Sequence, residues 1–191
     1  MEREVLLTGI GGQGVQLAAK VLALAATEEG REVMWLGTYG GTMRGGNTDA
    51  TIVIANEPIQ SPPMVSHAWS AVVCHPRFFE PFRSKLRQNG VVVADADLLE
   101  GDLGLGATRL LSVPATTIAR EHDAPKGASL VLLGAYAAMT GIVSAESLDR
   151  ALAQSLPTYR RETLETNQRA LAAGRGALPA LQVPAWSSEA A

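Results

Sequence analysis

Short apolar runs alternate with helix-patterned segments along most of this chain. Runs rich in valine, isoleucine and leucine each predict a strand, at residues 5–8, 33–36, 50–55, 71–74, 91–94 and 108–113. Because strands and helices alternate, we expect an α/β fold built on an open, mostly parallel sheet with helices on both faces. Little helical pattern occurs between Met34 and Cys74, so antiparallel strands or a long excursion are expected there.

The first predicted helix covers residues 15–29 and has one apolar face. Its apolar positions follow the i, i+3, i+4, i+7 spacing: Val15, Ala18, Ala19, Leu22, Ala25 and Ala26. Further helices are predicted at residues 77–89, 116–122, 129–140, 145–155 and 160–173, so the last third of the chain is mostly helical. The segment 129–140 is almost wholly apolar, which predicts a helix buried on most sides or lying in a subunit interface.

The length of 191 residues fits one ordinary domain with an appendage. We assign this domain to residues 1–174, because Gly174 closes the last helical pattern. Residues 178–191 show no regular period. The segment 175–191 is therefore either a frayed tail or an arm that contacts a partner.

Composition and charge exclude several classes of protein. The formal net charge is -3 without a dense Lys/Arg block, which argues against nucleic acid as a partner. The single cysteine excludes an intramolecular disulfide framework and any CxxC metal site. No apolar run approaches the ~18 residues of a membrane span, and the N-terminus shows no signal-peptide pattern. We therefore expect a cytoplasmic, soluble protein.

The glycine-rich stretch 9–14 lies between the first strand and the first helix. Its sequence, Gly-Ile-Gly-Gly-Gln-Gly, satisfies the GxGxxG pattern in the context that a Rossmann-like dinucleotide loop requires. A helix N-terminus in such a loop favours anions. However, the second strand ends in Leu36-Gly37-Thr38 without the acid that holds the ribose, and no Lys-Ser/Thr follows the glycines. The loop is a packing turn, a site for another anion, or a contact with a partner.

A second glycine-rich loop, residues 38–49, carries one arginine. Arg44 stands among small residues and glycines, so it can reach outward as a bidentate donor to phosphate or carboxylate. It can equally pin its own loop by bonding backbone carbonyls. The sequence leaves both roles open.

Other chemically suggestive residues have a structural reading. Cys74 precedes His75, but it ends an apolar strand, where a free cysteine is commonly a small core residue. His67 and His122 stand alone, so the spacing does not indicate a metal site. Asp95 and Asp97 follow a buried strand, where they are either ligand-binding groups or a loop and helix cap; we favour the cap.

The two glycine loops together resemble the gamma subunits of 2-oxoacid:ferredoxin oxidoreductases, the relatives of pyruvate and 2-oxoglutarate ferredoxin oxidoreductase. The matching segments are residues 11–15, 18–22, 39–40, 44–46, 58–62 and 131–135, with Asn167 and Gly174 in the closing helix. The likeness covers nearly the whole chain to about residue 174.

This resemblance implies an enzyme complex that converts a 2-oxoacid and coenzyme A to acyl-CoA and CO2 and passes electrons to ferredoxin. Such chemistry needs thiamine diphosphate and iron–sulfur clusters. One cysteine cannot hold a cluster, and Gly101-Asp102-Leu103 breaks the thiamine pattern GDG. The chain is then an accessory subunit, inactive alone. The cofactors would reside on alpha and beta subunits and a ferredoxin-like delta subunit.

The resemblance and the loops together give a set of candidate binding residues, with coenzyme A as a possible contact: Gly9, Gly11, Gly12, Gln13, Gly14, Tyr39, Arg44, Gly45, Gly46 and Asn47. No catalytic residue and no metal ligand is expected on this chain, which would form a hetero-oligomer, or a homodimer when isolated. The alternatives are a free-standing NAD(P)-binding oxidoreductase and a scaffold subunit whose loops bind no ligand.

Overall fold

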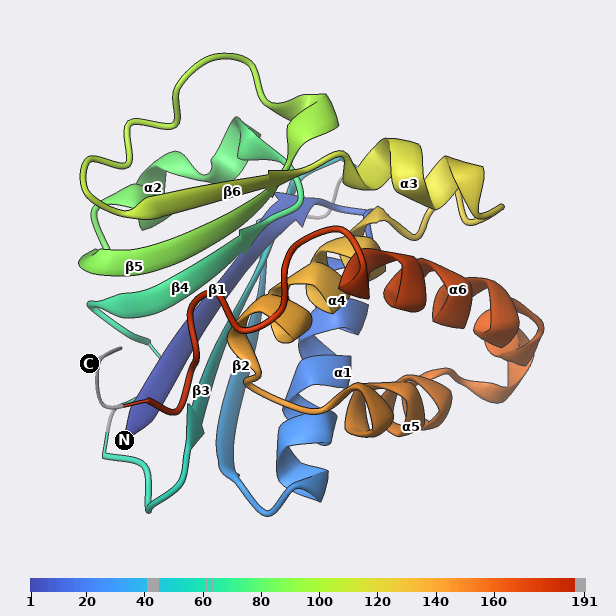
Figure 1. Ribbon diagram of the computed structural model, residues 1–191, viewed down its shortest axis with the longest axis horizontal. Helices are drawn as coiled ribbons and strands as arrows, with labels where there is room; N and C mark the ends of the chain where they lie inside the picture. Colours follow the sequence, from blue (N-terminus) through green and yellow to red (C-terminus); the bar gives the residue numbers. More distant parts are fainter. Residues whose placement is uncertain (41–44, 61, 63, 188–191) are drawn as a thin grey trace.

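The computed structural model describes residues 1–40, 45–60, 62 and 64–187, and its centre is a six-stranded sheet (Figure 1). The order of the strands across the sheet is β2-β3-β1-β4-β5-β6. The strands are β1 (Glu2–Ile10), β2 (Glu32–Gly40), β3 (Asn47–Ala55), β4 (Ala68–Val73), β5 (Leu86–Asp95) and β6 (Arg109–Val113).

The sheet is mixed, and β3 is the strand that reverses direction. The neighbouring strands β1, β4, β5 and β6 pair in parallel, whereas β3 pairs antiparallel with both β1 and β2. The reversal falls in the stretch between Met34 and Cys74, as predicted from its lack of helical pattern. As a result β2, which follows the first helix, is separated from β1 by a whole strand.

The long helices form two layers on one face of the sheet. Helices α1 (Val15–Glu28) and α4 (Ala128–Thr140) pack on the strands, while α5 (Ala145–Ser155) and α6 (Leu164–Arg175) lie outside them, against α1 and α4 respectively (Figure 1). Helix α3 (Ala115–Glu121) contacts α4 and α6 at the side. Among the described residues, the opposite face carries the short α2 (Glu80–Arg83), the 3-10 turn before it and extended segments. The predicted α/β fold is thus confirmed, with an uneven cover of the two faces.

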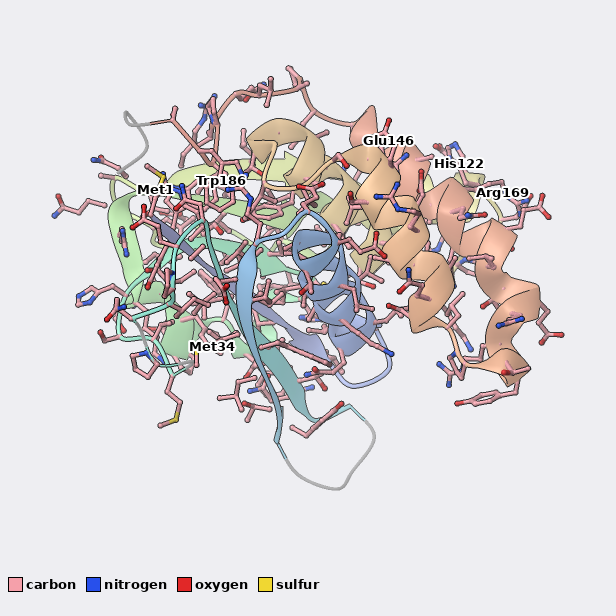
Figure 2. All side chains as sticks on the ribbon, turned by 90° about the horizontal axis from the view of Figure 1, so that it is seen from below. Met1, Met34, His122, Glu146, Arg169 and Trp186 are labelled. Atoms are coloured by element: carbon pink, nitrogen blue, oxygen red, sulfur yellow. The ribbon has the colours of Figure 1, made fainter. Side chains whose placement is uncertain are left out.

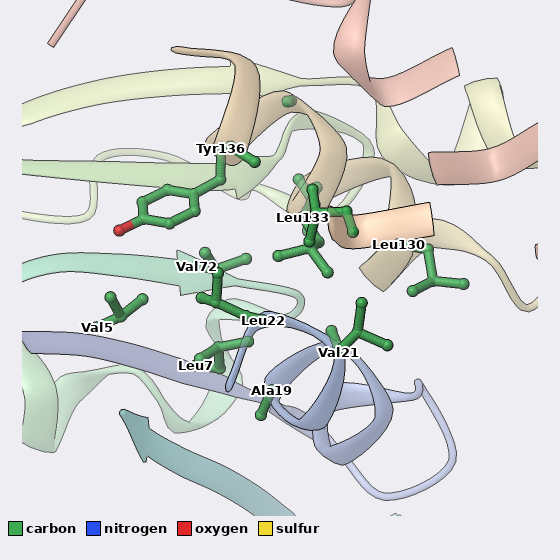
Figure 3. Packing of buried hydrophobic residues seen from close by; sticks show 14 of the residues in the cluster. Val5, Leu7, Ala19, Val21, Leu22, Val72, Leu130, Leu133 and Tyr136 are labelled. Carbon is green, nitrogen blue, oxygen red and sulfur yellow. The ribbon is translucent and has the colours of Figure 1, made fainter. Parts of the chain in front are cut away.

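The hydrophobic core divides between the two faces because side chains alternate along each strand. Val5 and Leu7 of β1 point toward the helices, where they meet α1 and α4 in the larger cluster (Figure 3). Leu6 points to the other face and joins a smaller cluster with Phe79 and Val92. Both faces of β1 are therefore buried, which explains its nearly continuous apolar sequence.

Helix α4 is buried by its own chain. One side packs on β4 and β5, and the other side packs against α6. The two helices approach closely at Gly134 and Gly174, since a methyl group added at either position would collide with the backbone of the opposite helix. The apolar segment 129–140 is thus explained by intrachain packing.

The predicted helix at residues 77–89 is wrong over its second half. A short 3-10 turn (Pro76–Phe78) and α2 end by Arg83, and β5 begins at Leu86. The pairing with β4 jumps from Ala68 with Leu86 to Ser70 with Val91, so Asn89 and Gly90 belong to an irregular part of a strand. An Asn-Gly pair is typical of a helix stop, but here it is accommodated in this irregularity.

The segment 176–187 lies on its own domain. The backbone N–H groups of Leu181 and Ala185 donate to the carbonyls of Ala138 (3.0 Å) and Thr140 (2.7 Å) on α4. Arg31 stacks on the Trp186 ring at 3.9 Å from the ring centre. These contacts anchor the segment on the protein, and a role as a partner-contacting arm stays a prediction.

The helices in the described ranges are all too short or too polar to cross a membrane.

Candidate functional site

The glycine loop at residues 11–14 joins β1 to α1. Gly12 and Gly14 have φ of +102° and +83°, a region that side chains with a Cβ rarely adopt. Gln13 holds the loop from inside: its Oε1 accepts the N–H of Ile10 (2.8 Å), and its Nε2 donates to the carbonyl of Cys74 (3.4 Å). The glycines are therefore required by the turn itself, and Gln13 acts as its internal support.

The two glycine loops, far apart in sequence, are in contact. The N–H of Gly11 donates to the carbonyl of Gly46 at 2.8 Å, because antiparallel pairing of β1 with β3 brings the ends of these strands together. The loops that carry the family resemblance thus form one surface. Arg44 lies outside the described residues, so its predicted outward reach stays a prediction.

A groove of about 950 Å³ lies beside this surface. Its walls come from the glycine loop and the start of α1, the ends of β2 and β3, the loop before α4, and the segment from α5 to α6. The lining residues are Gly11, Gly12, Gly14, Val15, Gln16, Leu17, Tyr39, Thr48, Lys126, Leu156, Tyr159, Arg160, Glu162, Thr163 and Asn167. Segments separated by more than a hundred residues therefore meet at one place.

The starts of helices α1 and α4, at and beside this groove, contribute to its electrostatic character. The N-cap residues of α1, α4 and α6 are Gly14, Gly127 and Thr163, and none of them makes a side-chain capping bond to a described residue. Helix geometry leaves the first N–H groups of α1 and α4 without intrahelical partners, and the dipole makes these ends positive. Helix α6 differs, because it continues from a 3-10 turn (Thr158–Thr163) and the N–H of Leu164 donates to the carbonyl of Arg161. By contrast α5, which starts elsewhere, is capped by Ser144.

Two cations add to the positive ends of the helices. Lys126 and Arg160 line the groove, and the acid Glu162 is the opposing charge among its lining residues. Tyr39 and Tyr159 also line it and are 68% and 75% exposed. Such a groove suits an elongated anionic ligand with a flat aromatic part.

The predicted binding residues divide between the groove and its support. Those that line it are Gly11, Gly12, Gly14 and Tyr39. Gly9 and Gln13 lie behind the loop, where a methyl group at Gly9 would come within 2.8 Å of the Gln13 Oε1. Gly45 and Gly46 lie at the contact between the loops.

Asn47 reaches along its own strand. Its Nδ2 donates to the Oδ2 of Asp49 at 2.5 Å, and burial raises the pKa of the Asp49 carboxyl. This bond ties the carboxyl of the buried Asp49 to the amide of Asn47 at the start of β3. The role of Asn47 as a ligand contact stays a prediction.

Sequence reasoning missed the half of the groove that comes from the C-terminal third. Lys126, Arg160 and Thr163 have no motif around them, and their positions depend on how α4 and α6 pack. Two weak signals were present. A lysine stands two residues before the start of an apolar helix, and Tyr159, Arg160 and Arg161 cluster before the last helix.

Asp95 and Asp97 cap α3. Asp95 Oδ1 accepts the N–H groups of Ala115 (3.0 Å) and Thr116 (3.3 Å), and its Oδ2 accepts the Thr116 hydroxyl (2.6 Å). Asp97 similarly accepts the N–H of Thr117 at 2.7 Å. The favoured structural interpretation of these carboxylates is therefore correct, since the hydrogen bonds that they accept stabilise a helix start.

Cys74 is a core residue. Its side chain is 2% exposed, and burial raises the pKa of its thiol from 9.0 to about 12, with a smaller contribution from Asp95. A nucleophilic cysteine needs the opposite shift. In the parts of the chain that the structure describes, no three His, Cys, Asp or Glu side chains are grouped to hold a metal.

Cys74 should resist alkylation by iodoacetamide at pH 8 in the folded protein and react promptly in urea, because the buried thiol stays protonated. The raised pKa also makes stability fall as pH rises from about 9 toward 12, since the unfolded thiol ionises first, at up to ~1.4 kcal/mol per pH unit. Urea titrations of the wild type and Cys74→Ala across this range would measure the difference. Rapid alkylation under native conditions would contradict the core assignment.

The geometry also differs from a dinucleotide crevice. In that fold the strand after the first helix lies directly beside β1, parallel to it, and carries the acid for the ribose. Here β3 lies antiparallel between β1 and β2, and the end of β2 reads Gly37-Thr38-Tyr39-Gly40.

Residues 4–177 match the family described as pyruvate ferredoxin/flavodoxin oxidoreductase. The chain belongs to this family. Among its relatives, the 2-oxoglutarate synthase subunit KorC of Methanocaldococcus jannaschii is 33% identical over 85% of this chain and 88% of its own length. The pyruvate/ketoisovalerate oxidoreductases common subunit gamma of Pyrococcus furiosus is 32% identical over 87% of this chain and 92% of its own length. The resemblance to gamma subunits is thereby confirmed.

Other members of this pyruvate ferredoxin/flavodoxin oxidoreductase family carry the domain within a longer chain. This chain covers 36% of the ketoisovalerate oxidoreductase subunit VorA of Methanothermobacter thermautotrophicus, to which it is 32% identical. The fold is shared with the keto/oxoacid ferredoxin oxidoreductase gamma subunit of Geobacter sulfurreducens, with a TM-score of 0.76 and 24% identity over 93% of this chain and 98% of that one.

The 2-oxoglutarate:ferredoxin oxidoreductase of Magnetococcus marinus, solved with 2-oxoglutarate, coenzyme A and succinyl-CoA, also shares the fold. Its TM-score is 0.79 at 19% identity, over 91% of this chain and 30% of that one.

Proposed function

We propose that this chain is the accessory gamma subunit of a 2-oxoacid:ferredoxin oxidoreductase complex and that its groove binds the phosphates of coenzyme A. The observation that carries the second part is that the uncapped N-terminus of α1 lines one groove together with Lys126, directly before the N-cap of α4, and Arg160. Unpaired N–H groups and positive dipole ends stabilise phosphate charge.

Coenzyme A matches the chemistry of the groove in two ways. Its pyrophosphate and ribose phosphate carry several negative charges, which the helix ends and the two cations can neutralise. Its adenine offers a flat π-face, and the exposed rings of Tyr39 and Tyr159 line the same groove. Arg44, from the second glycine loop, is a further phosphate donor in this proposal.

The redox chemistry belongs to other subunits. Thiamine diphosphate would supply the decarboxylation chemistry and iron–sulfur clusters would accept the electrons, but the described residues hold no cluster of ligands and Cys74 is buried with a raised pKa. The chain contributes binding, orientation and exclusion of water. The similar relatives are named for different oxoacids, namely 2-oxoglutarate, pyruvate and ketoisovalerate. We therefore expect the partner subunits to select the oxoacid.

In the complex purified through a tag on this chain, the double variant Lys126→Ala, Arg160→Ala should raise KM for coenzyme A about ten- to a hundredfold. We expect kcat and KM for the 2-oxoacid to stay close to wild type, because contacts to remote phosphates contribute uniform binding. Steady-state kinetics with each substrate varied in turn measures the split. Arg169→Ala is the matched control, since Arg169 pairs with Glu165 on an exposed part of α6.

The two parts of the proposal fail in different ways. An unchanged KM for coenzyme A in the double variant would refute the groove assignment and leave the subunit role intact. If tagged chain emerged from its native cell without a partner that contains thiamine and iron–sulfur clusters, the subunit role itself would be refuted. Tight binding of NAD or NADP in calorimetry of the isolated chain would instead support the free-standing oxidoreductase.

A further inference from the structure

Strand β2 forms a long open edge of the sheet. It is nine residues long and pairs with β3 on one side without a register shift, from Glu32 with Ala55 to Gly40 with Asn47. No described strand pairs with its other side. Its residues are exposed throughout except for the half-buried Val33. The N–H and C=O groups on this side are therefore available to another strand.

This edge lacks the features that usually prevent pairing. Natural edge strands carry lysines, prolines, bulges or inward charges that disfavour association. In β2 the one charged residue is Glu32 at the start, and proline is absent. Instead Met34, Trp35, Leu36 and Tyr39 are 39%, 44%, 36% and 68% exposed. Figure 2 shows Met34 beside β2, on the side away from α1.

We propose that β2 pairs antiparallel with β2 of a second copy of this chain, about a two-fold axis at Leu36. Two six-stranded sheets would then join into one continuous sheet. A two-fold interface brings each residue of one copy against a different residue of the other, except at the axis. The proposal does not rest on coenzyme A binding, although Tyr39 belongs both to β2 and to the groove.

The sequence of β2 is complementary to itself in this register. Trp35 lies opposite Gly37 of the second copy, so a large ring covers a residue without a side chain. Glu32 lies opposite Gly40, which keeps the two acids at opposite ends of the ribbon. All nine residues of the strand are paired only when the axis is at Leu36, the middle of the strand.

The side chains also fall on suitable faces. A methyl group added at Gly37 would meet Gln16 of α1, so Gly37 and, by alternation, Trp35 lie on the helix side of the sheet. Met34 and Leu36 lie on the other side. Pairing would cover apolar side chains on both faces at once. This self-complementarity favours a second copy over an unrelated strand.

A cysteine at the axis tests this register directly. Directly opposed residues in an antiparallel pair have Cα atoms about 4.5–5.5 Å apart, within the range of a disulfide. In the full chain, Leu36→Cys should therefore form a disulfide-linked dimer under mild oxidation. Met34→Cys is the control, because its copies would lie about 14 Å apart. The native Cys74 is buried and does not compete.

Adding Thr38→Cys to Met34→Cys should restore the cross-link, since residues 34 and 38 oppose each other in this register. Non-reducing gels at several protein concentrations measure the fraction of cross-linked dimer for Leu36→Cys, for Met34→Cys and for the double variant. Cross-linking of Met34→Cys alone, or none with Leu36→Cys, would overturn the proposal.

Charge at the axis provides a second test that does not depend on oxidation. Leu36→Lys and Leu36→Glu should each weaken the dimer at least about tenfold, because two like charges would face each other. An equimolar mixture of the two variants should restore it. Light scattering after size exclusion measures the mass, and thermal melts check folding. A wild-type chain that stays monomeric at all concentrations, or variants that dimerise as well as the wild type, would refute the pairing and direct β2 to a different subunit.

Discussion

Gly174→Ala is expected to destabilise the protein by about 3 kcal/mol or more, because it would drive α6 off α4. A methyl group at this position would lie 2.7 Å from the carbonyl carbon of Val131 and 2.8 Å from its Cα, and it would collide with the carbonyl oxygen. These are backbone atoms of a buried helix, so the collision cannot be relieved by a rotamer change. Gly134→Ala should behave alike, since its methyl group would collide with the carbonyl oxygen of Leu171.

Helix propensity alone would predict the opposite effect of Gly174→Ala on stability. Alanine is favoured over glycine in a helix by about 1 kcal/mol, so a helix that packed loosely would gain stability. Gly176→Ala is the matched control, because its nearest neighbour is an atom 3.7 Å away and its φ of -88° suits any residue. Urea unfolding of the three variants measures the effect. Equal stability of Gly174→Ala and Gly176→Ala would show that the helices do not cross this closely.

The same crossing matters for the groove. Helix α6 and the turn before it supply Thr163, Asn167 and Arg160 to the wall that faces the glycine loop. A displaced α6 would move this wall away from α1. The variants at the crossing should therefore also raise KM for coenzyme A in any complex that still assembles.

Local sequence information was sufficient for the elements whose environment is uniform. Every strand buried on both faces, such as β1 and β5 from Val91 onward, appeared as an apolar run. Helices α4 and α5 were predicted within a residue of their observed bounds. The prediction of a helix failed at residues 84–90, because polar residues in an irregular, exposed part of a strand resemble the end of a helix.

The candidate site was predictable only on the side where a motif exists. The glycine loop could be found because its turn requires positive φ at Gly12 and Gly14, a constraint that acts within a few residues. Lys126 and Arg160 reach the groove through the packing of α4 and α6, which is a constraint between distant residues. The position of β3 between β1 and β2 is likewise a tertiary property, and it is what separates this groove from a dinucleotide crevice.

Glu4→Ala is expected to cost about 3 kcal/mol of stability. Glu4 is 3% exposed, and its Oε2 accepts the backbone N–H of Trp69 (3.2 Å) while its Oε1 accepts Nη2 of Arg87 (2.6 Å). Without the carboxylate, a buried N–H loses its acceptor, which is costly, and the half-exposed Arg87 loses its partner, which costs less because water can solvate it. Burial and Arg87 lower the pKa of the neighbouring Arg3 and Glu4 opposes them, so the variant would also disfavour the charged form of Arg3.

Two further variants test whether the effect of Glu4 comes from its buried position or from ion pairing alone. Glu80→Ala removes an equally short ion pair, 2.6 Å to Arg83, whose side chains are 72% and 43% exposed. It should change stability by no more than about 0.5 kcal/mol. Glu4→Gln keeps an acceptor for the Trp69 N–H but offers no charge to Arg87. Its loss of stability should therefore lie between those of Glu4→Ala and Glu80→Ala. Urea unfolding at pH 7 gives the order. If Glu4→Ala were as mild as Glu80→Ala, the start of β4 would not depend on this carboxylate, and a bound water would have to satisfy Trp69.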